Sequence, residues 1–425
     1  MKSNALSELG RRSEDPPISW LMEIALSRPK LISLAAGFTD NESLPVRAAR
    51  ELLDEILRSK EKGQPSLQYG TTQGDPVLRE LTAQDLRLLD RALGSHAAYS
   101  PERMVITNGS QQMLYMVTEA MCDAGDIVLV EDPTYFVYTS ILQSHGVGAR
   151  GIRLDQDGID LTALEKTLAS LKKSGQLCRV KMLYLVSYYQ NPTGVTTSYA
   201  KKVAALKLLR QYERAAGHSI YLLEDAAYRE LRFTGDDEKS ALAAKGFADR
   251  VIYAGTYSKP FATGTRVGFG ISPEEIHTVV MRIKGNHDFG TSNLLQQLVA
   301  RAISSGKYEE HLVELQKRYA HKARVMLRAM KESFPSEVEW WEAKDGLYFW
   351  ARLPKSVQTG IESKLFKSCL ANDVFYVPGE LCYADDPTRT KPNHEMRLSF
   401  GGASEKNIQT GIARLGEVLK KFLRR

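Results

Sequence analysis

The stretch SIYLLED, residues 219–225, decides the fold, because it is a short apolar run that ends in two acidic residues. A similar run, KMLYLVS at 181–187, precedes it, and RVIYAGTYS at 250–258 follows it. Between the first two runs, residues 198–217 carry apolar side chains at helical spacing. Near-continuous apolar strands that alternate with helices are typical of parallel sheets covered by helices. These residues predict an α/β fold with a mostly parallel sheet covered on both faces.

The alternation of strands and helices extends in both directions from this centre. Upstream, MVIT at 104–107 and DIVLVED at 126–132 are further expected strands. Downstream, a long helical stretch over 291–334 leads into strands at 338–353 and 395–400, which is typical of a smaller α+β unit. A chain of 425 residues is long enough for two domains. We expect a large domain over 46–300, a small domain from 16–45 and 301–425, and a loosely held or disordered lead over 1–15.

Composition excludes several classes of protein. The hydrophobic fraction of 43% and the charged fraction of 25% are those of a soluble globular protein, and a net charge of +6 is modest for this length. Basic and acidic residues are interspersed, so no nucleic-acid partner is expected. The longest uncharged window, 182–200, contains a Pro-Thr-Gly turn and cannot span a membrane. The four cysteines, which lie far apart, predict reduced thiols in a cytoplasmic protein without a metal site: Cys122, Cys178, Cys369 and Cys382.

Polar side chains follow the three central strands, at the point where each strand ends. Asn191 comes after the first, Asp225 and Tyr228 after the second, and Lys259 after the third. Taken alone, such an Asp is more often a cap and such a Lys is more often solvated. Ligands of α/β sheets bind beyond the carboxyl ends of the strands, so the joint placement of these groups predicts a binding site.

This set of groups suits one cofactor. A lysine amine forms a Schiff base with an aldehyde, and pyridoxal 5'-phosphate is the aldehyde cofactor that also needs an acid at its ring nitrogen. Asp225 fits that role, because a carboxylate keeps the ring nitrogen protonated. Asn191 and Tyr228 could bind the phenolic oxygen of the ring. Tyr135 follows another strand end and could stack on the ring.

A phosphate group also needs a binding site. TNGSQQM, residues 107–113, places Gly109 and Ser110 at the start of a helix directly after a strand, where backbone N–H groups favour an anion. A plain glycine turn with a serine cap is an equally good interpretation of that stretch alone. Three residues near Lys259 would add hydroxyls and a guanidinium to the same phosphate: Thr256, Ser258 and Arg266.

Three segments together resemble the class I/II aminotransferases of pyridoxal-phosphate fold type I: SYYQNPTG (187–194), EDAAYRELRF (224–233) and TYSKPFATGTRVGFG (256–270). The resemblance is nearest to the kynurenine/2-aminoadipate aminotransferase group and to the effector domain of MocR-type regulators, and it covers almost the whole chain. It implies an enzyme that exchanges an amino group between an L-α-amino acid and a 2-oxo acid through a pyridoxal-phosphate Schiff base on Lys259.

The resemblance also implies roles for individual residues. Lys259 would be the attachment point and the proton carrier, Asp225 would pair with the ring nitrogen, and Arg397 would bind the substrate α-carboxylate. Asn191 and Gly37 would lie against the substrate. Tyr69 would reach the phosphate of a second subunit, which implies a homodimer with shared sites. The remaining cofactor contacts would be Ser110, Gln111, Tyr135, Tyr228, Thr256, Ser258 and Arg266.

Two alternatives stay open at the level of the sequence. A lyase, decarboxylase or oxidase would use the same lysine and cofactor. A regulator that senses the cofactor is a remote alternative, because about 45 residues precede the first large helix and they lack a helix-turn-helix pattern. The substrate side chain also stays open. Tyr188 and Tyr189, which stand where the family commonly has a proline, could wall an aromatic pocket or pack in the core.

Overall fold

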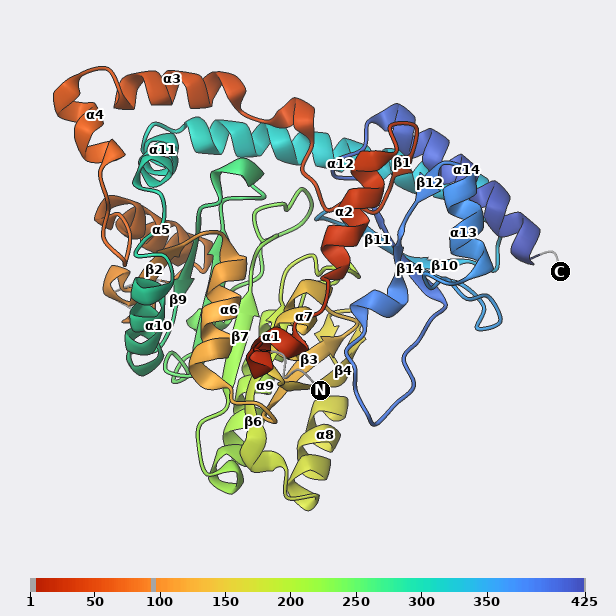
Figure 1. Cartoon of the computed structure of the whole chain (residues 1–425), viewed down its shortest axis with the longest axis horizontal. Coiled ribbons are helices and arrows are strands. Elements are labelled where there is room, and N and C mark those ends of the chain that lie inside the picture. Colours follow the sequence, from red (N-terminus) through yellow and green to blue (C-terminus); the bar gives the residue numbers. More distant parts are fainter. Residues whose placement is uncertain (1–4, 93–96, 424–425) are drawn as a thin grey trace.

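The computed structural model describes residues 5–92 and 97–423. Its largest sheet has the strand order β2-β9-β8-β7-β6-β3-β4-β5 (Figure 1). Strands β4, β3, β6, β7 and β8 pair in parallel, whereas β9 runs antiparallel to β8 and β2, and β5 runs antiparallel to β4. The strands are β2 Met104–Thr107, β3 Ile127–Asp132, β4 Gly148–Asp155, β5 Gly158–Ile159, β6 Val180–Val186, β7 Tyr221–Asp225, β8 Val251–Thr256 and β9 Gly268–Ile271. The predicted α/β fold with a mostly parallel sheet is therefore confirmed.

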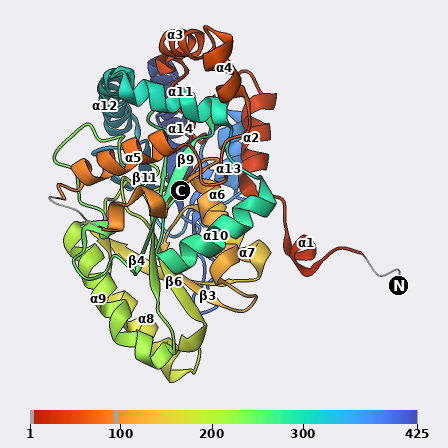
Figure 2. The same ribbon diagram turned by 90° about the vertical axis from the view of Figure 1, so that its left-hand side faces the viewer.

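Helices cover both faces of this sheet because its central strands are apolar on both sides. Nearly every residue of β3, β6, β7 and β8 is buried. Figure 2 shows α8 and α9 on one side of the sheet and α6, α7 and α10 on the other. These helices are α6 Ser110–Met121, α7 Phe136–His145, α8 Leu161–Lys173, α9 Tyr199–Ala216 and α10 Glu274–His287.

A second, antiparallel sheet follows in the C-terminal third, with the strand order β10-β11-β14-β13. Its strands are β10 Glu339–Trp341, β11 Tyr348–Arg352, β13 Val377–Pro378 and β14 Glu395–Ser399. The N-terminal β1 (Ile32–Ser33) pairs in parallel with β12 (Val374–Phe375), so an early segment joins this C-terminal region. The expected helical stretch over 291–334 forms two helices, because Ser305 and Gly306, the latter with a φ of 77°, lie between them. The division into domains at 45 and 300 stays a prediction.

The remaining helices lie around these sheets. They are α1 Glu8–Arg12, α2 Pro17–Ser27, α3 Val46–Ile56, α4 Lys60–Leu67, α5 Pro76–Leu89, α11 Asn293–Ser304, α12 Lys307–Ser333, α13 Lys364–Ala371 and α14 Glu405–Leu423. The expected lead over 1–15 lies partly outside the described residues. Within its described part, α1 contacts α7: the Arg12 Nε donates to the Ser144 carbonyl (3.2 Å), and the Gln143 amide donates to the Arg12 carbonyl (2.6 Å). Within the described ranges, no helix is both long and apolar enough to cross a membrane.

Candidate active site

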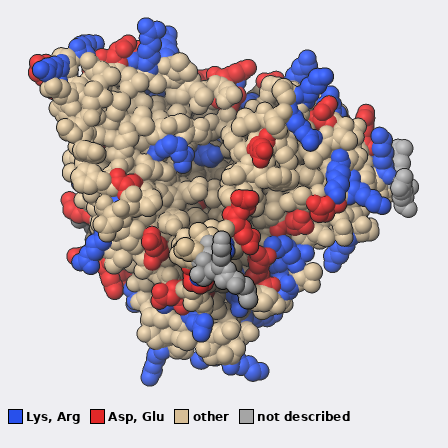
Figure 3. Space-filling model, in the orientation of Figure 1, with Lys and Arg blue, Asp and Glu red and all other residues tan. Residues whose placement is uncertain are grey.

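A cavity of about 130 Å³ lies at the carboxyl ends of β6, β7 and β8. Its lining contains many of the residues that the sequence singles out: Gly109, Ser110, Gln111, Tyr135, Asp225, Tyr228, Thr256, Ser258, Lys259 and Arg266. Val186, Ala227 and Thr263 complete the lining. Figure 3 shows a hollow near the middle of one face of the molecule, with basic side chains in it. Parallel strands place their carboxyl ends at one edge of the sheet, which is why residues far apart in sequence meet here.

Lys259 follows β8 and points its amine toward the N-terminal segment, where the Nζ donates to the Gly37 carbonyl at 2.7 Å. Within the described part of the chain, no carboxylate forms an ion pair with this amine. Burial, together with the charges of Arg397 and Arg266, lowers the pKa of Lys259 to about 8. An appreciable fraction of the amine is therefore neutral near physiological pH, which is the form that reacts with a carbonyl carbon.

Asp225 ends β7 and is 3% exposed. Its carboxylate accepts hydrogen bonds from the Tyr184 hydroxyl (2.9 Å) and from the backbone N–H of Ala227 (3.1 Å). Burial raises the pKa of Asp225 to about 6, and the two hydrogen bonds act in the opposite direction. The carboxylate therefore stays ionised at neutral pH. It lies in the cavity wall, where it can pair with a cationic nitrogen.

A chain of hydrogen bonds joins Asn191, Tyr228 and Arg397. The Asn191 Nδ2 donates to the Tyr228 hydroxyl at 3.2 Å, and the Asn191 Oδ1 accepts from the Arg397 Nη1 at 2.6 Å. The Arg397 Nη2 also donates to the Ala35 carbonyl at 2.6 Å. The Tyr228 hydroxyl lies 3.1 Å from the hydroxyl of Tyr348. These contacts fix the orientation of the amide and of the guanidinium beside it.

The site lies where the two sheets meet. Arg397 comes from β14 and Tyr348 from β11 of the antiparallel sheet, and the guanidinium lies 4.5 Å from the centre of the Tyr348 ring. Gly37 completes this wall. A Cβ at Gly37 would lie 2.8 Å from the Tyr348 hydroxyl, so only glycine fits without a shift of the tyrosine.

The opposite end of the cavity is suited to an anion. Gly109, with a φ of 76°, precedes α6, whose first backbone N–H groups have no acceptor within the helix. The Arg266 Nη1 donates to the Ser258 hydroxyl at 3.2 Å, and a Cβ at Gly109 would lie 2.8 Å from the Arg266 Nη2. The Thr256 hydroxyl accepts from the Ser258 N–H at 3.1 Å. The N–H groups at the start of α6, the Ser258 hydroxyl and the Arg266 guanidinium thus converge, and these donors, called the anion cradle below, fit a phosphate group. The Thr256 hydroxyl beside them donates to the Val267 carbonyl at 3.2 Å.

One predicted residue lies apart from the cavity. Tyr69 is 82% exposed, and its ring packs edge-on against that of Phe289 at a centroid distance of 5.3 Å. Tyr188 also lies elsewhere: it is fully buried, with the Lys202 amine 4.0 Å and the Arg229 guanidinium 4.9 Å from its ring centre. The interpretation of Tyr188 as core packing is therefore confirmed over that of a pocket wall.

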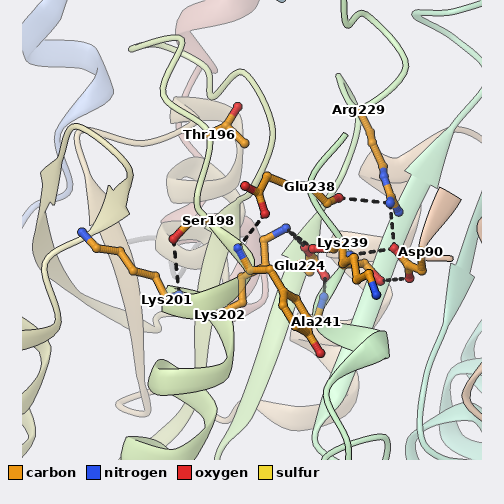
Figure 4. A network of polar contacts seen from close by, with 12 residues as sticks. Asp90, Thr196, Ser198, Lys201, Lys202, Glu224, Arg229, Glu238, Lys239 and Ala241 are labelled. Carbon is orange, nitrogen blue, oxygen red and sulfur yellow. Dashed lines mark hydrogen bonds and ion pairs between the residues drawn. The ribbon is translucent and has the colours of Figure 1, made fainter. Parts of the chain in front are cut away.

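A buried ionic network supports the segment that carries Asp225 and Tyr228 (Figure 4). Lys202 and Glu224 form an ion pair of 2.9 Å in which both side chains are fully buried. The Arg229 Nη2 lies 2.7 Å from a carboxylate oxygen of Asp90. Since Glu224 and Arg229 flank the segment in sequence, the network holds both of its ends.

Two further residues at the site, Tyr184 and Tyr348, are not predicted from the sequence. Each lies within an apolar strand, and each places its hydroxyl on a predicted site residue. The sequence does offer one signal: a tyrosine within an apolar strand places a hydroxyl in the core, and a buried hydroxyl needs a hydrogen-bond partner. The partner itself depends on the folded arrangement.

Comparisons with known proteins agree with this geometry. The family model described as "Aminotransferase class I and II" matches residues 29–415. The chain is similar to aromatic-amino-acid aminotransferase 1 of Thermococcus litoralis (31% identity; 93% of this chain and 89% of that protein). It is also similar to 2-aminoadipate transaminase of Thermus thermophilus (31% identity; 99% of this chain and 98% of that protein). The crystal structure of Pyrococcus horikoshii kynurenine aminotransferase superposes with a TM-score of 0.88 (31% identity; 99% of this chain and 98% of that chain).

These matches favour amino-group transfer over the lyase, decarboxylase, oxidase and regulatory alternatives. The fold is that of the fold type I pyridoxal-phosphate aminotransferases. The residues present in the cavity fit the cofactor of this family, because an amine, a buried carboxylate and an anion cradle share one cavity. The chain therefore belongs to the class I and II aminotransferase family and is a pyridoxal-phosphate-dependent aminotransferase that acts on an amino acid and a 2-oxo acid.

Proposed function

We propose that this cavity is the catalytic site and that Lys259 is the covalent attachment point for pyridoxal 5'-phosphate. When bound, this cofactor supplies an aldehyde that links to an amine and a ring that accepts the electron pair released at the substrate α-carbon. The observation that carries the proposal is the amine of Lys259, whose pKa is lowered to about 8 in a cavity that it shares with Asp225 and the anion cradle.

The family resemblance and the shared cavity support roles for the other residues. The carboxylate of Asp225 would hold a proton on the ring nitrogen, and Asn191 and Tyr228 would bind the phenolic oxygen. Tyr135 would stack on the ring. The phosphate-binding residues are Ser110, Gln111, Thr256, Ser258 and Arg266. The amine of Lys259, when it is not linked to the cofactor, would carry the proton from the substrate α-carbon.

Arg397 binds the α-carboxylate of the substrate. Two of its five N–H groups are used by Asn191 and Ala35, which leaves one on each Nη and one on Nε. A carboxylate can therefore accept two parallel hydrogen bonds from a guanidinium that is already oriented. Gly37, whose carbonyl accepts from the Lys259 amine, would lie against the substrate at this end.

We further propose aromatic L-amino acids as the preferred amino donors. Aromatic rings surround the carboxylate-binding group: the Arg397 guanidinium lies 4.5 Å from the Tyr348 ring and 5.8 Å from the Phe136 ring. Two of the relatives above are named for aromatic amino acids and kynurenine. The relative named for 2-aminoadipate makes that amino acid the second candidate donor.

A homodimer with shared sites is part of the proposal. Tyr69 and Phe289 are both large, apolar and exposed, and they line a surface groove of about 590 Å³ between 66–70 and 289–294. A second copy of the chain that covers this groove would bring Tyr69 to the partner's phosphate. We also propose a cytoplasmic location, because all four cysteines are free thiols.

The test uses Lys259→Ala beside Lys406→Ala, a change of an exposed lysine. Lys259→Ala should lose the visible absorbance of the cofactor–lysine link and lower turnover by several orders of magnitude, as expected for the loss of a covalent catalyst. Lys406→Ala should change neither. Unchanged turnover in Lys259→Ala refutes the role. A panel of amino donors with 2-oxoglutarate as acceptor tests the substrate: preference for 2-aminoadipate over phenylalanine, tyrosine and kynurenine refutes the aromatic assignment.

A further inference from the structure

A second layer of polar side chains binds the turn that precedes α6. This turn, 108–110, carries the N–H groups of the anion cradle. Asp288 follows α10, and its Oδ2 accepts hydrogen bonds from the side-chain amides of Asn108 (2.7 Å) and Gln112 (2.6 Å). The Oε1 of Gln112 accepts from the backbone N–H of Asn108 at 2.8 Å. The turn is therefore fixed by its own backbone and by one carboxylate from a distant element.

Lys284 stabilises this carboxylate. Its side chain is fully buried, and its Nζ lies 2.9 and 2.8 Å from the two oxygens of Asp288. The same amine donates to the Gln112 Oε1 and to the Thr291 hydroxyl, both at 3.3 Å. The Thr291 hydroxyl in turn donates to the carbonyl of Ile106 in β2 at 3.2 Å. Lys284 is thus connected to both the strand that enters the turn and the helix that leaves it.

The charges in this layer have a direct consequence for an anion at the cradle. The Asp288 carboxylate lies behind a turn that is expected to hold a phosphate, and two uncompensated negative charges would repel each other. The ammonium of Lys284 neutralises the carboxylate while leaving its hydrogen bonds to Asn108 and Gln112 intact. The pair can therefore orient the turn without repelling the anion.

We infer that Lys284 and Asp288 are positioning residues for the phosphate group of the cofactor. Neither lies among the residues that line the cavity, so they would act by holding the backbone N–H groups of Ser110 and Gln111 toward the anion. This inference rests on the proposed function, because it takes the cavity as the cofactor site.

The test compares two ligands that differ only in the phosphate. Cofactor is removed from the full-length protein, which is then titrated with pyridoxal 5'-phosphate and, separately, with pyridoxal. Lys284→Met should weaken binding of pyridoxal 5'-phosphate about tenfold or more, the loss expected when a charge-assisted hydrogen bond is misaligned, and change pyridoxal binding by less than about threefold. Lys284→Met/Asp288→Asn should bind the phosphate ligand more tightly than Lys284→Met, because it removes the unpaired carboxylate.

Equal losses for the two ligands, or an unchanged affinity for pyridoxal 5'-phosphate, overturn the inference. If Lys284→Met does not fold, Asn108→Ala decides the question, since it removes one hydrogen bond to Asp288 and keeps the ion pair. Asn108→Ala should also weaken the binding of pyridoxal 5'-phosphate more than that of pyridoxal. Lys406→Met, at an exposed position, serves as the control. Failure of the proposed function is distinguishable, because the protein with its natural Lys284 would then bind pyridoxal 5'-phosphate no better than its Lys259→Ala variant does.

Discussion

The contact between Arg397 and the substrate carboxylate gives a prediction whose size follows from the structure. Arg397→Lys keeps the positive charge but replaces a planar fork of N–H groups with a single ammonium. In the structure the guanidinium has one free N–H on each Nη after its bonds to Asn191 and Ala35. A carboxylate bound by both would lose one of two charge-assisted hydrogen bonds in the variant.

A hydrogen bond of this kind contributes about 1.5–3 kcal/mol, and each 1.36 kcal/mol corresponds to a factor of ten in rate. Arg397→Lys should therefore lower kcat/KM for amino-acid donors by about 10- to 150-fold. The assay is the first half-reaction under single-turnover conditions, followed by the absorbance of the cofactor. The cofactor spectrum before substrate is added should be unchanged, which separates loss of substrate binding from loss of cofactor.

Arg352→Lys is the matched control, because Arg352 lies on the neighbouring strand β11 and pairs with Glu395 at 2.8 Å, outside the cavity. This variant should keep kcat/KM within about twofold, as expected for a partly exposed ion pair. The reasoning is refuted if Arg397→Lys loses less than about threefold in kcat/KM, or if both variants lose the same factor.

Three further predictions follow from buried charges. Asp225→Asn should lower turnover by roughly 100- to 5,000-fold, the effect of losing one partner of a buried ion pair; single-turnover rates within threefold of the unsubstituted enzyme would contradict this. The rate at which cofactor attaches to the cofactor-free protein should rise with pH up to about pH 8 and then level off. The reason is that the neutral amine predominates above the lowered pKa of Lys259, about 8. A stopped-flow rate that keeps rising to pH 10 would show that the pKa of this amine is not lowered. Lys202→Met should lower the free energy of unfolding by about 3–5 kcal/mol, since it leaves the buried Glu224 carboxylate without its cationic partner. The double variant Lys202→Met/Glu224→Gln should recover part of this loss. Denaturant titrations that give equal losses for both variants would show that the buried charge is not the cause.

The central part of the fold and the lysine side of the cavity could be predicted from the sequence. Asp225, Tyr228 and Lys259 follow apolar strands, and parallel strands bring their carboxyl ends to one edge. Local patterns were sufficient here because each strand is a continuous apolar run. The helix after Gly109 was predictable for a similar reason, since it follows directly on a buried strand.

The short strand β9 is not predicted, because two of its four residues are glycine, which is depleted in strands. Its glycines have a structural reason. β9 lies between β2 and β8, and a Cβ at Gly268 would lie 2.6 Å from the backbone of Gly109. This close approach brings Arg266 to the start of α6. A sequence pattern does not reveal it, because the two segments are far apart in the chain.

The wall that Tyr348 and Gly37 form together could also not be predicted from the sequence. Arg397 and Gly37 were expected at the site through the resemblance, whereas the contact between the Gly37 position and the Tyr348 hydroxyl depends on how the antiparallel sheet meets the N-terminal segment. Long-range contacts of this kind have no local signal in the chain. The same is true of the bond between Asn108 and Asp288.

The most direct measurement of the central claim is chemical. Borohydride fixes the link between pyridoxal 5'-phosphate and the amine that holds it, and digestion with mass spectrometry then locates the labelled lysine. The account predicts the label on the peptide that contains Lys259, with its loss in Lys259→Ala. A label on another lysine, or an unlabelled protein after saturation with the cofactor, would contradict the account.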